Sequence, residues 1–561
     1  MDLKALFSTK LSEVLKGSLT TKEIYSLIET PKNDEHGDLA FPCFQLAKIQ
    51  KISPIEIAKQ LASQINDTVF SKIDAVGPYV NIFFSKKELG KAIINPILHQ
   101  EQNYGSSEIG KEKTVVLDLS SPNIAKPFSM GHLRSTVIGN AIANLAKKCG
   151  YRTVKINHIG DWGTQFGKLI VAYHRWGNEE AVAANPIGEL FHLYVRFHQE
   201  AEKNPNLEDE GRAAFKKLEN GDSEYLKLWE SFRNESLRAF KSIYDLLSIE
   251  FDSFQGEAFY NDKMDEIVQM LKEQSLLELS DGAEVVRLDE QQIPPCLIKK
   301  SDGATLYATR DLAAALFRQR EYKFDEALYI VGQEQTIHFQ QVKGVLKKLG
   351  YVWAEQMEHI PFGLILQHGK KMSTRKGRVI LLEDVLNEAI KLAKKNIVEK
   401  NPGIHNPDEV ANAVGVGAVI FHDLKNDRMN NIEFSLRDML TFEGETGPYV
   451  QYTNARAHSI LRKYKGTDVC FEGLDDDESW DVLKLLNEFP RIIERSYKQY
   501  APSILAKYLI HVSQAFNKYY GKIRILAEDE HLQSRVSIVN AVTIVLTEGL
   551  QLLGMKAPKE M

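Results

Sequence analysis

Residues 114–150 read TVVLDLSSPNIAKPFSMGHLRSTVIGNAIANLAKKCG and predict a strand, a loop and a long helix. The opening TVVLDL is nearly all apolar and rich in β-branched side chains, which is typical of a strand buried in a parallel sheet. An amphipathic helix should begin at Gly131 and His132 and end at Gly150, and a second strand is expected at residues 154–157. Strand, loop, helix and strand predict a βαβ unit whose loop lies at a helix N-terminus, where phosphate charge is favoured.

Around this unit the sequence divides into three parts. Residues 1–110 predict a small α+β module, in which residues 79–84 are the clearest strand. Residues 111–400 predict an α/β domain with further strands at 327–331 and 362–366, interrupted by a charged helical insertion at about 172–300. Residues 401–561 are expected to be almost entirely helical, with an acidic loop at 468–481.

Length and composition exclude several classes of protein. The chain has 561 residues, 43% of them hydrophobic, and its 70 basic and 76 acidic residues give a net charge of −6, unlike a histone-like protein. The longest apolar stretch, residues 413–421, is far too short to cross a membrane, and the N-terminus does not resemble a signal peptide. Four widely spaced cysteines are expected to be reduced and buried: Cys43, Cys149, Cys296 and Cys470. We therefore expect a cytoplasmic protein.

Common nucleotide-binding and hydrolase motifs are absent from the sequence. Gly167-Lys168 lacks the remainder of a Walker A motif, and Gly415-Val-Gly417 is better explained by close packing of two helices than by dinucleotide binding. No GxSxG, HExxH or CxxC pattern occurs, so the sequence predicts no protein-bound metal.

Two loops remain that could hold phosphate groups. In the first, His132 could donate a hydrogen bond to a phosphate or ribose oxygen, although for this loop taken alone a helix-capping histidine is the favoured explanation. The second, HGKKMSTRKGR at residues 368–378, could clamp a triphosphate, although a single basic run is often only a solvated surface. Two such loops in one α/β domain are much less common than either loop alone.

These loops carry a family resemblance. SMGH at residues 129–132 resembles the second half of the HIGH signature of class I aminoacyl-tRNA synthetases, and KMSTR at 371–375 resembles their KMSKS loop. Longer segments are similar to arginyl-tRNA synthetases from the N-terminal module to the last residue: SSPNIAKPFSMGHLRST at 120–136, HIGDWGTQFG at 158–167, LYATRDL at 306–312, TGPYVQYTNAR at 446–456 and LLGMKAPKEM at 552–561.

The resemblance implies both fold and activity. It implies a Rossmann-type parallel-sheet catalytic domain, an N-terminal module that contacts the tRNA elbow and a C-terminal helical bundle that binds the anticodon. The implied reaction is ATP-dependent ligation of L-arginine to the 3′ end of its tRNA through arginyl-adenylate, with Mg²⁺ accompanying ATP. A monomer is expected, and the family implies that tRNA binds before arginine is activated.

The resemblance also assigns an arginine site. It maps onto residues that supply carboxylates, amides and a phenol: Asp118, Asn123, Tyr307, Asp311 and Gln335. The guanidinium is planar and carries five donors, so it needs acceptors placed in a matching geometry. Taken without the resemblance, Asp311 could merely cap a helix and Asp118 could merely end a strand.

The implied catalytic residues belong to the two loops. They are His132, Lys126, Lys371, Arg375 and Lys376, and the ATP contacts are Ser129, Gly131, His132, Met372 and Ser373. Two positions depart from the signatures, since Ser129 stands for the first histidine and Thr374 for the second lysine of KMSKS. Lys126 is expected to replace that lysine.

Expected RNA contacts lie at both ends of the chain. Tyr79 and Asn81 alternate along one strand and could stack on and hydrogen-bond an unpaired base. Residues 482–524 hold eight basic and two acidic residues, with five tyrosines interleaved, most of them expected in the core: Tyr497, Tyr500, Tyr508, Tyr519 and Tyr520. Two alternatives stay open at this point, namely a class I nucleotidyl transferase for another substrate and, because of Ser129, an inactive tRNA-binding paralogue.

Overall fold

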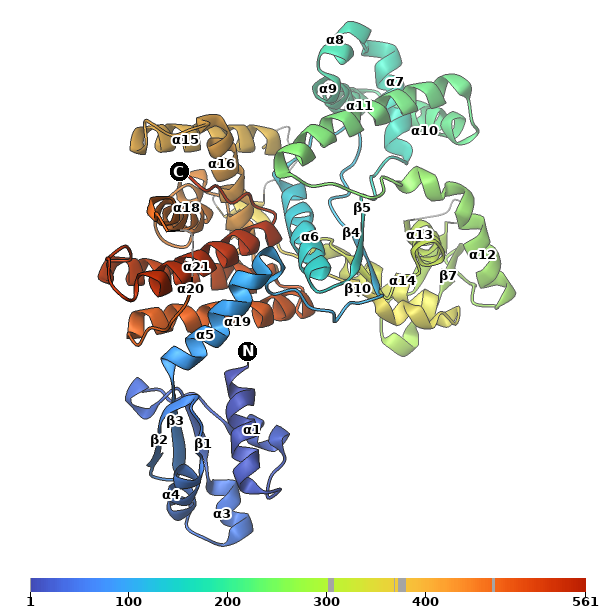
Figure 1. Ribbon diagram of the computed structural model, residues 1–561. Coiled ribbons are helices and arrows are strands. Elements are labelled where there is room, and N and C mark those ends of the chain that lie inside the picture. Colours follow the sequence, from blue (N-terminus) through green and yellow to red (C-terminus); the bar gives the residue numbers. More distant parts are fainter. Residues whose placement is uncertain (1, 301–306, 368, 372–379, 467–469) are drawn as a thin grey trace. The chain divides into compact units, whose positions relative to one another are not determined.

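The computed structural model describes residues 2–300, 307–367, 369–371, 380–466 and 470–561 (Figure 1). The chain forms two compact units. The first consists of Met1–Tyr104, Thr453–Pro490 and His511–Glu548, and the second of Gly105–Tyr452, Arg491–Ile510 and Gly549–Met561.

A four-stranded parallel sheet organises the second unit. Its strands are β4 (Thr114–Asp118), β5 (Arg152–Ile156), β9 (Glu326–Tyr329) and β10 (Met357–His359), in the order β10-β9-β4-β5. All five residues of β4 are buried, as the apolar run predicts. Helix α6 (Met130–Lys148) connects β4 to β5 and is followed by Gly150 at φ +89°. The predicted βαβ unit is confirmed, and the carboxyl ends of its strands meet at one edge.

The strand expected at 362–366 lies elsewhere. Strand β11 (Ile365–Gln367) begins three residues later and belongs to a separate small sheet with β12 (Lys370–Lys371) and β13 (Ile432–Glu433). Sequence periodicity over so short a run identifies the type of element but not its partners.

Helices dominate the segment between β5 and α13. Helices α7 (Thr164–Trp176), α8 (Glu179–Ala184), α9 (Pro186–Lys203), α10 (Asn206–Glu219) and α11 (Ser223–Leu247) pack together, as Figure 1 shows. They are followed by η3 (Glu257–Lys263), α12 (Met264–Glu273) and a three-stranded antiparallel sheet of β6 (Glu278–Ser280), β7 (Ala283–Val286) and β8 (Cys296–Lys299). Residues 278–299 are therefore a sheet inside the range expected to be helical.

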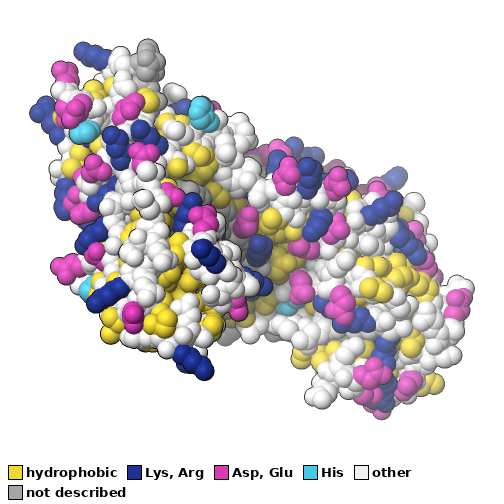
Figure 2. All heavy atoms as spheres, turned by 60° about the horizontal axis from the view of Figure 1, so that its bottom comes forward, with side chains coloured by type: hydrophobic (Ala, Val, Ile, Leu, Met, Phe, Trp, Pro, Cys, Tyr) yellow, Lys and Arg dark blue, Asp and Glu magenta, His cyan; other side chains and the backbone are white. Residues whose placement is uncertain are grey.

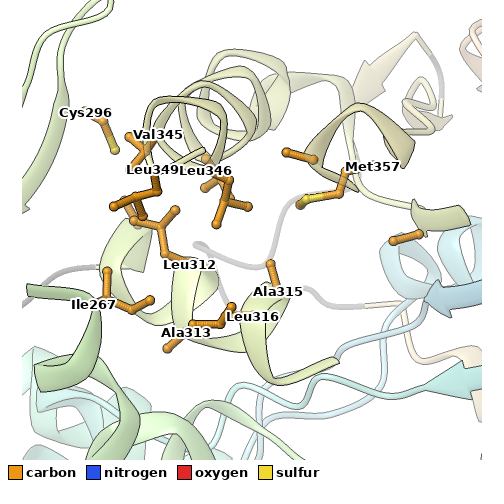
Figure 3. Packing of buried hydrophobic residues seen from close by; sticks show 14 of the residues in the cluster. Ile267, Cys296, Leu312, Ala313, Ala315, Leu316, Val345, Leu346, Leu349 and Met357 are labelled. Atoms are coloured by element: carbon orange, nitrogen blue, oxygen red, sulfur yellow. The ribbon is translucent and has the colours of Figure 1, made fainter. Parts of the chain in front are cut away.

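Apolar side chains fix helix α13 (Tyr307–Tyr322) beside the parallel sheet. Leu312, Ala313, Ala315 and Leu316 of α13 pack between α12 and α14 (Thr336–Lys348), with Cys296 and Met357 at the margins (Figure 3). Close packing leaves α13 little freedom to shift, so the polar side chains on its remaining surface are held in place.

The N-terminal part of the first unit is the predicted α+β module. Strands β1 (Leu39–Pro42), β3 (Tyr79–Phe84) and β2 (Phe70–Val76) form an antiparallel sheet in that order. Five helices accompany it: α1 (Leu3–Leu15), α2 (Thr21–Leu27), α3 (Phe44–Gln50), α4 (Pro54–Gln64) and α5 (Lys86–Gln100).

The C-terminal sequence is helical, as predicted. Its helices are α15 (Leu382–Lys400), α16 (Pro407–Leu424), α17 (Leu436–Met439), α18 (Gly447–Lys463), α19 (Asp477–Lys498), α20 (Pro502–Lys522) and α21 (Leu532–Leu552). A Cβ atom at Gly415 would lie 2.6 Å from the backbone nitrogen of Ile390, so this glycine lets α15 and α16 approach closely. The packing interpretation of Gly415-Val-Gly417 is therefore confirmed.

Two further sequence expectations can be compared with the structure. Cys43, Cys149 and Cys296 are buried free thiols, but Cys470 is exposed, so the expectation that all four are buried is wrong. Within the described residues, no helix is long and apolar enough to cross a membrane. On the face shown in Figure 2, basic and acidic side chains are interspersed.

Candidate active site

The loop between β4 and α6 has an unusual backbone. Ser120, Ser121 and Ala125 adopt positive φ angles of 72°, 50° and 57°, a conformation that is costly for residues with a side chain. Hydrogen bonds hold this conformation, because the backbone N–H of Ser120 donates to Ser135 Oγ at 2.9 Å and that of Ala125 to Ser236 Oγ at 2.8 Å. The loop is thus shaped by α6 on one side and by α11 of the helical insertion on the other.

His132 lies in the first turn of α6 as a neutral imidazole. Its Nδ1 atom accepts a hydrogen bond from the backbone N–H of Ser129 at 3.1 Å, so the neutral ring carries its proton on Nε2. Burial lowers the pKa of His132 to about 4, and the nearby positive charge of Lys126 acts in the same direction. At neutral pH, His132 can therefore donate one hydrogen bond from Nε2 without carrying a charge.

Lys126 is held beside the insertion helices. Its Nζ donates to Gln165 Oε1 at 3.2 Å and lies 4.9 Å from the centre of the Tyr194 ring. Burial lowers the pKa of this lysine. Lys126 and His132 lie close enough for the charge of the lysine to lower the pKa of the histidine, as expected for two residues of one loop.

Ser129 and Gly131 belong to the same signature segment as His132. Ser129 is the N-cap of α6, and its Oγ lies 3.2 Å from His132 Nδ1. Gly131 is exposed, and an added Cβ would meet only Ser129 Oγ, at 3.5 Å. The surface at Gly131 is open to a ligand.

Asp118 ends β4 and is already paired within the protein. Its Oδ2 lies 2.8 Å from Arg318 Nη1, and its Oδ1 accepts from Ser121 Oγ at 2.9 Å. Arg318 is buried, and its other terminal nitrogen lies 3.3 Å from His158 Nδ1. Asp118, the first of the two carboxylates expected to bind arginine, is therefore already paired with the guanidinium of Arg318.

Asp311 is the second expected carboxylate and remains partly open. Its Oδ2 lies 2.6 Å from His338 Nε2, its Oδ1 lies 3.9 Å from His158 Nε2, and its side chain is 29% exposed. Burial raises the pKa of Asp311, but the hydrogen bond and charge of His338, together with the charges of His158 and Arg318, give a net downward shift. The group is an ionised acceptor with one accessible edge.

The other expected arginine contacts lie near the carboxyl ends of the same strands. Asn123 is exposed and approaches Gly160 so closely that a Cβ there would be 1.8 Å from Asn123 Oδ1. Tyr307 begins α13 and is 62% exposed, and Gln335 is exposed in η5 (Gln333–Gln335) after β9. In open α/β sheets, ligands bind at this edge.

Several polar residues of this region were not predicted from the sequence. Arg318 lies on the same helix as Asp311 but pairs with Asp118 of β4, and His338 of α14 pairs with Asp311 of α13, so spacing within one helix could not have identified either partner. Glu257 is a largely buried carboxyl group, 13% exposed, that lies 3.9 Å from Arg310 Nη1, and desolvation raises its pKa to about 7. No local pattern distinguishes Glu257 from other acidic residues.

Of the second candidate loop, residues 368–378, the structure describes only residues 369–371. Met372, Ser373, Arg375 and Lys376 lie outside the described residues, as does Thr374, while Lys371 is described as part of the β12 backbone. After the gap, the backbone of Leu381 pairs with that of Ser129.

The expected RNA contacts differ in exposure. Tyr79 is half-buried and packs edge-on against Phe44, with ring centres 5.8 Å apart, whereas Asn81 is buried. Among the described residues, Asn81 Oδ1 has no hydrogen-bond partner. Asn81 is therefore less accessible to a base than Tyr79.

Most of the C-terminal tyrosines belong to the core. Tyr497, Tyr508 and Tyr519 are buried, and Tyr500 is half-buried with its hydroxyl 3.4 Å from Glu326 Oε2. Tyr520 is 44% exposed, so it is the accessible member of the set. The expectation that most of these residues are structural is confirmed.

Family models match nearly the whole chain. Residues 1–84 match the arginyl-tRNA synthetase N-terminal domain, residues 93–436 the catalytic domain of class I tRNA synthetases (R), and residues 450–561 the DALR anticodon-binding domain.

Individual relatives agree with these matches. Arginine–tRNA ligase 2 of Bacillus anthracis is 60% identical, and the arginine–tRNA ligase of an Exiguobacterium species 59% identical, each over the full length of both chains. The solved arginyl-tRNA synthetase of Thermus thermophilus covers all of both chains at 24% identity with a TM-score of 0.80, and that of Plasmodium falciparum gives 0.78 at the same identity, covering all of this chain and 98% of the other. The two solved structures share the fold.

Proposed function

The chain belongs to the arginyl-tRNA synthetases, a family of class I aminoacyl-tRNA synthetases, and acts as an arginine–tRNA ligase; we propose that the site at the carboxyl ends of β4, β5 and β9 carries out this reaction. In the first step, the arginine carboxylate attacks the α-phosphorus of ATP, and the bond to the β-phosphate breaks, giving arginyl-adenylate and pyrophosphate. In the second, a hydroxyl of the terminal tRNA ribose attacks the adenylate carbonyl and releases AMP. Neither step requires a covalent bond to the protein.

His132 and Lys126 are proposed to stabilise charge on ATP. The Nε2–H of His132 is available because Nδ1 already accepts from Ser129. Lys126 adds a positive charge near the same loop, and Lys371, Arg375 and Lys376 are proposed to act on the pyrophosphate from the second loop. Preorganised donors and charges of this kind are usually the largest contribution to such catalysis.

The remaining ATP contacts are proposed at both loops. Ser129 and Gly131 would lie against the nucleotide because Gly131 leaves open space beside the helix N-terminus. Met372 and Ser373 are proposed from their place in the second loop. Within the described residues, no cluster of three or more His, Cys, Asp or Glu side chains could hold a metal ion. Mg²⁺ is proposed to accompany ATP, because phosphate oxygens are ligands that this cation prefers.

Arginine is proposed to bind along the edge of the sheet. Asp311 would receive the guanidinium, because its charge is not balanced by an internal arginine. Tyr307 and Gln335 would add hydrogen bonds from exposed positions, and Asn123 would hold the α-amino and carboxylate groups. Asp118 would contribute through the pair that it forms with Arg318.

Contacts with tRNA are proposed at both ends of the chain. Tyr79 would contact the tRNA elbow and Asn81 would support it from within the sheet, while Tyr520 would contact the anticodon. We propose the domain division 1–110, 111–400 and 401–561; the family matches support three parts, although the catalytic match extends to residue 436. A cytoplasmic monomer is proposed from the resemblance to the family.

A charging assay tests the proposed function. Purified protein should attach arginine, but not lysine or citrulline, to tRNA in an ATP-dependent reaction, because a buried acceptor left unpaired by an analogue costs several kcal/mol, about 10⁴-fold or more in specificity. Adenylation of another substrate would point to a different nucleotidyl transferase. Binding of tRNA without turnover would point to an inactive paralogue.

A further inference from the structure

Arg134 is a buried charged residue two positions after His132 on helix α6. Its relative exposure is 1%, and its guanidinium contacts three segments that are distant in sequence. Nε lies 3.1 Å from Asp423 Oδ2 on α16, Nη1 donates to the backbone oxygen of Asn430 at 2.8 Å, and the guanidinium carbon lies 5.9 Å from the centre of the Phe362 ring.

Two of these segments lead directly into the small sheet. Phe362 and Asn430 precede β11 and β13, which pair in parallel. The backbone N–H of Ile432 donates to the oxygen of Leu364 at 2.9 Å, and the backbone N–H of Leu364 donates to Asn431 Oδ1 at 2.8 Å. Segments 362–365 and 430–432 therefore form one packed piece, which Arg134 attaches to α6.

This packed piece is joined to the described start of the second loop through strand pairing. Strand β11 pairs with β12, which ends at Lys371, directly before Met372 and Ser373 in the chain. The segment after the loop is attached to the signature itself, because the backbone N–H of Met130 donates to the oxygen of Ile380 at 3.2 Å and that of Leu382 donates to the oxygen of Phe128 at 3.0 Å.

We propose that Arg134 is a positioning residue for ATP, which fixes the start of the second phosphate-binding loop relative to His132. The segment after the loop is joined to the signature, residues 129–132, through backbone hydrogen bonds. The segment before the loop is joined to helix α6 through Arg134. The proposal rests on the proposed function, since it assumes that both loops bind ATP.

The chemistry of the contact favours arginine. A guanidinium is rigid and planar, so it can bond a carboxylate and a carbonyl in two fixed directions, whereas a lysine ammonium is a single point at the end of a flexible chain. Removing Arg134 and Asp423 from water also costs much of what their attraction returns, so stability alone explains the pair poorly. A geometric role accounts for both the residue type and its burial.

Replacement by lysine tests the proposal with a matched control. Arg134→Lys keeps a positive charge beside Asp423 but cannot hold Asn430 in the same geometry. Arg535 is the control, because it is a buried arginine of the other unit that likewise pairs with a carboxylate, Asp529 at 2.8 Å, and donates to backbone oxygens, Ile525 at 2.9 Å and Ala527 at 2.6 Å. Both variants are assayed for arginine-dependent ATP–pyrophosphate exchange in the presence of tRNA, beside their melting temperatures.

The expected result separates positioning from folding. Arg134→Lys should raise the KM for ATP about 10-fold and lower kcat, because small misplacements of a binding group are costly, while the KM for arginine changes less than about 2-fold. Arg535→Lys should leave both KM values within about 2-fold of the parent protein. An unchanged KM for ATP in Arg134→Lys, with kcat falling only as the folded fraction falls, would overturn the proposal.

A double variant tests the proposal in a protein that keeps most of its stability. Arg134→Met combined with Asp423→Leu removes both charges and should recover much of the stability that Arg134→Met alone loses. Its KM for ATP should nevertheless remain raised, because neither side chain can bond the backbone oxygen of Asn430. Recovery of the parental KM for ATP in the double variant would count against positioning by Arg134. Failure of the unmodified protein to form arginyl-tRNA would instead refute the proposed function.

Discussion

At the scale of single residues, burial sets the charge state of the groups proposed to contact ATP. His132 is neutral at neutral pH because desolvation and the nearby charge of Lys126 lower its pKa, and its ring orientation is set by the backbone N–H of Ser129. The protein thereby obtains a hydrogen-bond donor from a residue type that, at its ordinary pKa of about 6.5, would titrate near the physiological range.

The lowered pKa of His132 predicts a flat pH response. His132→Asn should lower kcat for adenylate formation by about 10²-fold, the size expected for loss of one preorganised donor. The ratio of the parental kcat to the kcat of the variant should stay constant between pH 6 and 8, because His132 gains its proton only as the pH falls towards 4. A change of this ratio with a midpoint near pH 6.5, measured by pyrophosphate exchange, would contradict a neutral His132.

The replacement of a signature lysine by Thr374 predicts an order of effects. If Lys126 takes over the role of that lysine, Lys126→Ala should reduce adenylate formation more than Lys371→Ala does. Single-turnover rates of adenylate formation measure this order. The reverse order would reject compensation by Lys126.

The different surroundings of the two carboxylates predict a division between stability and substrate binding. Asp118→Asn leaves the buried Arg318 unpaired and should lower the free energy of unfolding by about 3–5 kcal/mol. Asp311→Asn, at a partly exposed position, should instead raise the KM for arginine more than tenfold while the KM for ATP stays unchanged. Denaturant unfolding and exchange kinetics on both variants check this division, and a raised KM for ATP in Asp311→Asn would argue against it.

At the scale of elements, the turns after the parallel strands shape the site. The turn after β5 brings Gly160 against Asn123 of the preceding loop, and Asn123 and Gly160 also pair through their backbones. Helix α11 supports the same loop through Ser236 and through Tyr244, whose hydroxyl lies 2.8 Å from Ser120 Oγ. The helical insertion is therefore part of the framework of the active site.

The close approach at Gly160 predicts a specific defect. Gly160→Ala places a methyl group where Asn123 Oδ1 lies, so Asn123 must move, and the KM for arginine should rise about 10-fold or more. Gly521→Ala is the control, because no atom lies within 4 Å of the added Cβ. Equal KM values for arginine in the two variants would show that the position of Asn123 is unimportant.

At the scale of the whole molecule, charge is distributed rather than separated. The sequence places an acidic segment before a basic one, but Lys518 and Asp481 lie 3.3 Å apart, and Lys522 lies 2.5 Å from Glu478. Asp481 also lies 3.3 Å from Lys484, so part of the local positive excess is balanced within the protein. The basic side chains that remain unbalanced should then determine where RNA binds.

This balance predicts how RNA binding responds to salt. Affinity for the cognate tRNA should fall by at least about 10-fold between 50 and 200 mM salt, because each phosphate contact releases counterions. Filter binding or fluorescence titration at several salt concentrations measures the slope. An affinity that is insensitive to salt would mean that phosphate contacts contribute little.

Local sequence predicts elements well but not distant pairs. Strand β3, buried strand β4 and helix α6 follow from hydrophobic patterns and end residues within each segment. The partners of Arg134, Arg318 and His338 lie beyond their own helices, and Asp423 is almost 300 residues from Arg134. The family resemblance identified Asp118 and Asp311 as arginine contacts. Only the folded structure shows that Asp118 is paired with an internal arginine and that Asp311 is partly exposed.

The order of strands in the parallel sheet has a consequence for synthesis on the ribosome. Strand β5 follows β4 closely in the chain, but β9, the neighbour of β4 on the other side, ends about 210 residues after it, and β10 about 240. At roughly 5–20 residues per second, the ribosome needs tens of seconds to supply them. During that time one edge of the most apolar strand in the sheet has no neighbour, so the nascent chain is most prone to aggregate before its second half emerges.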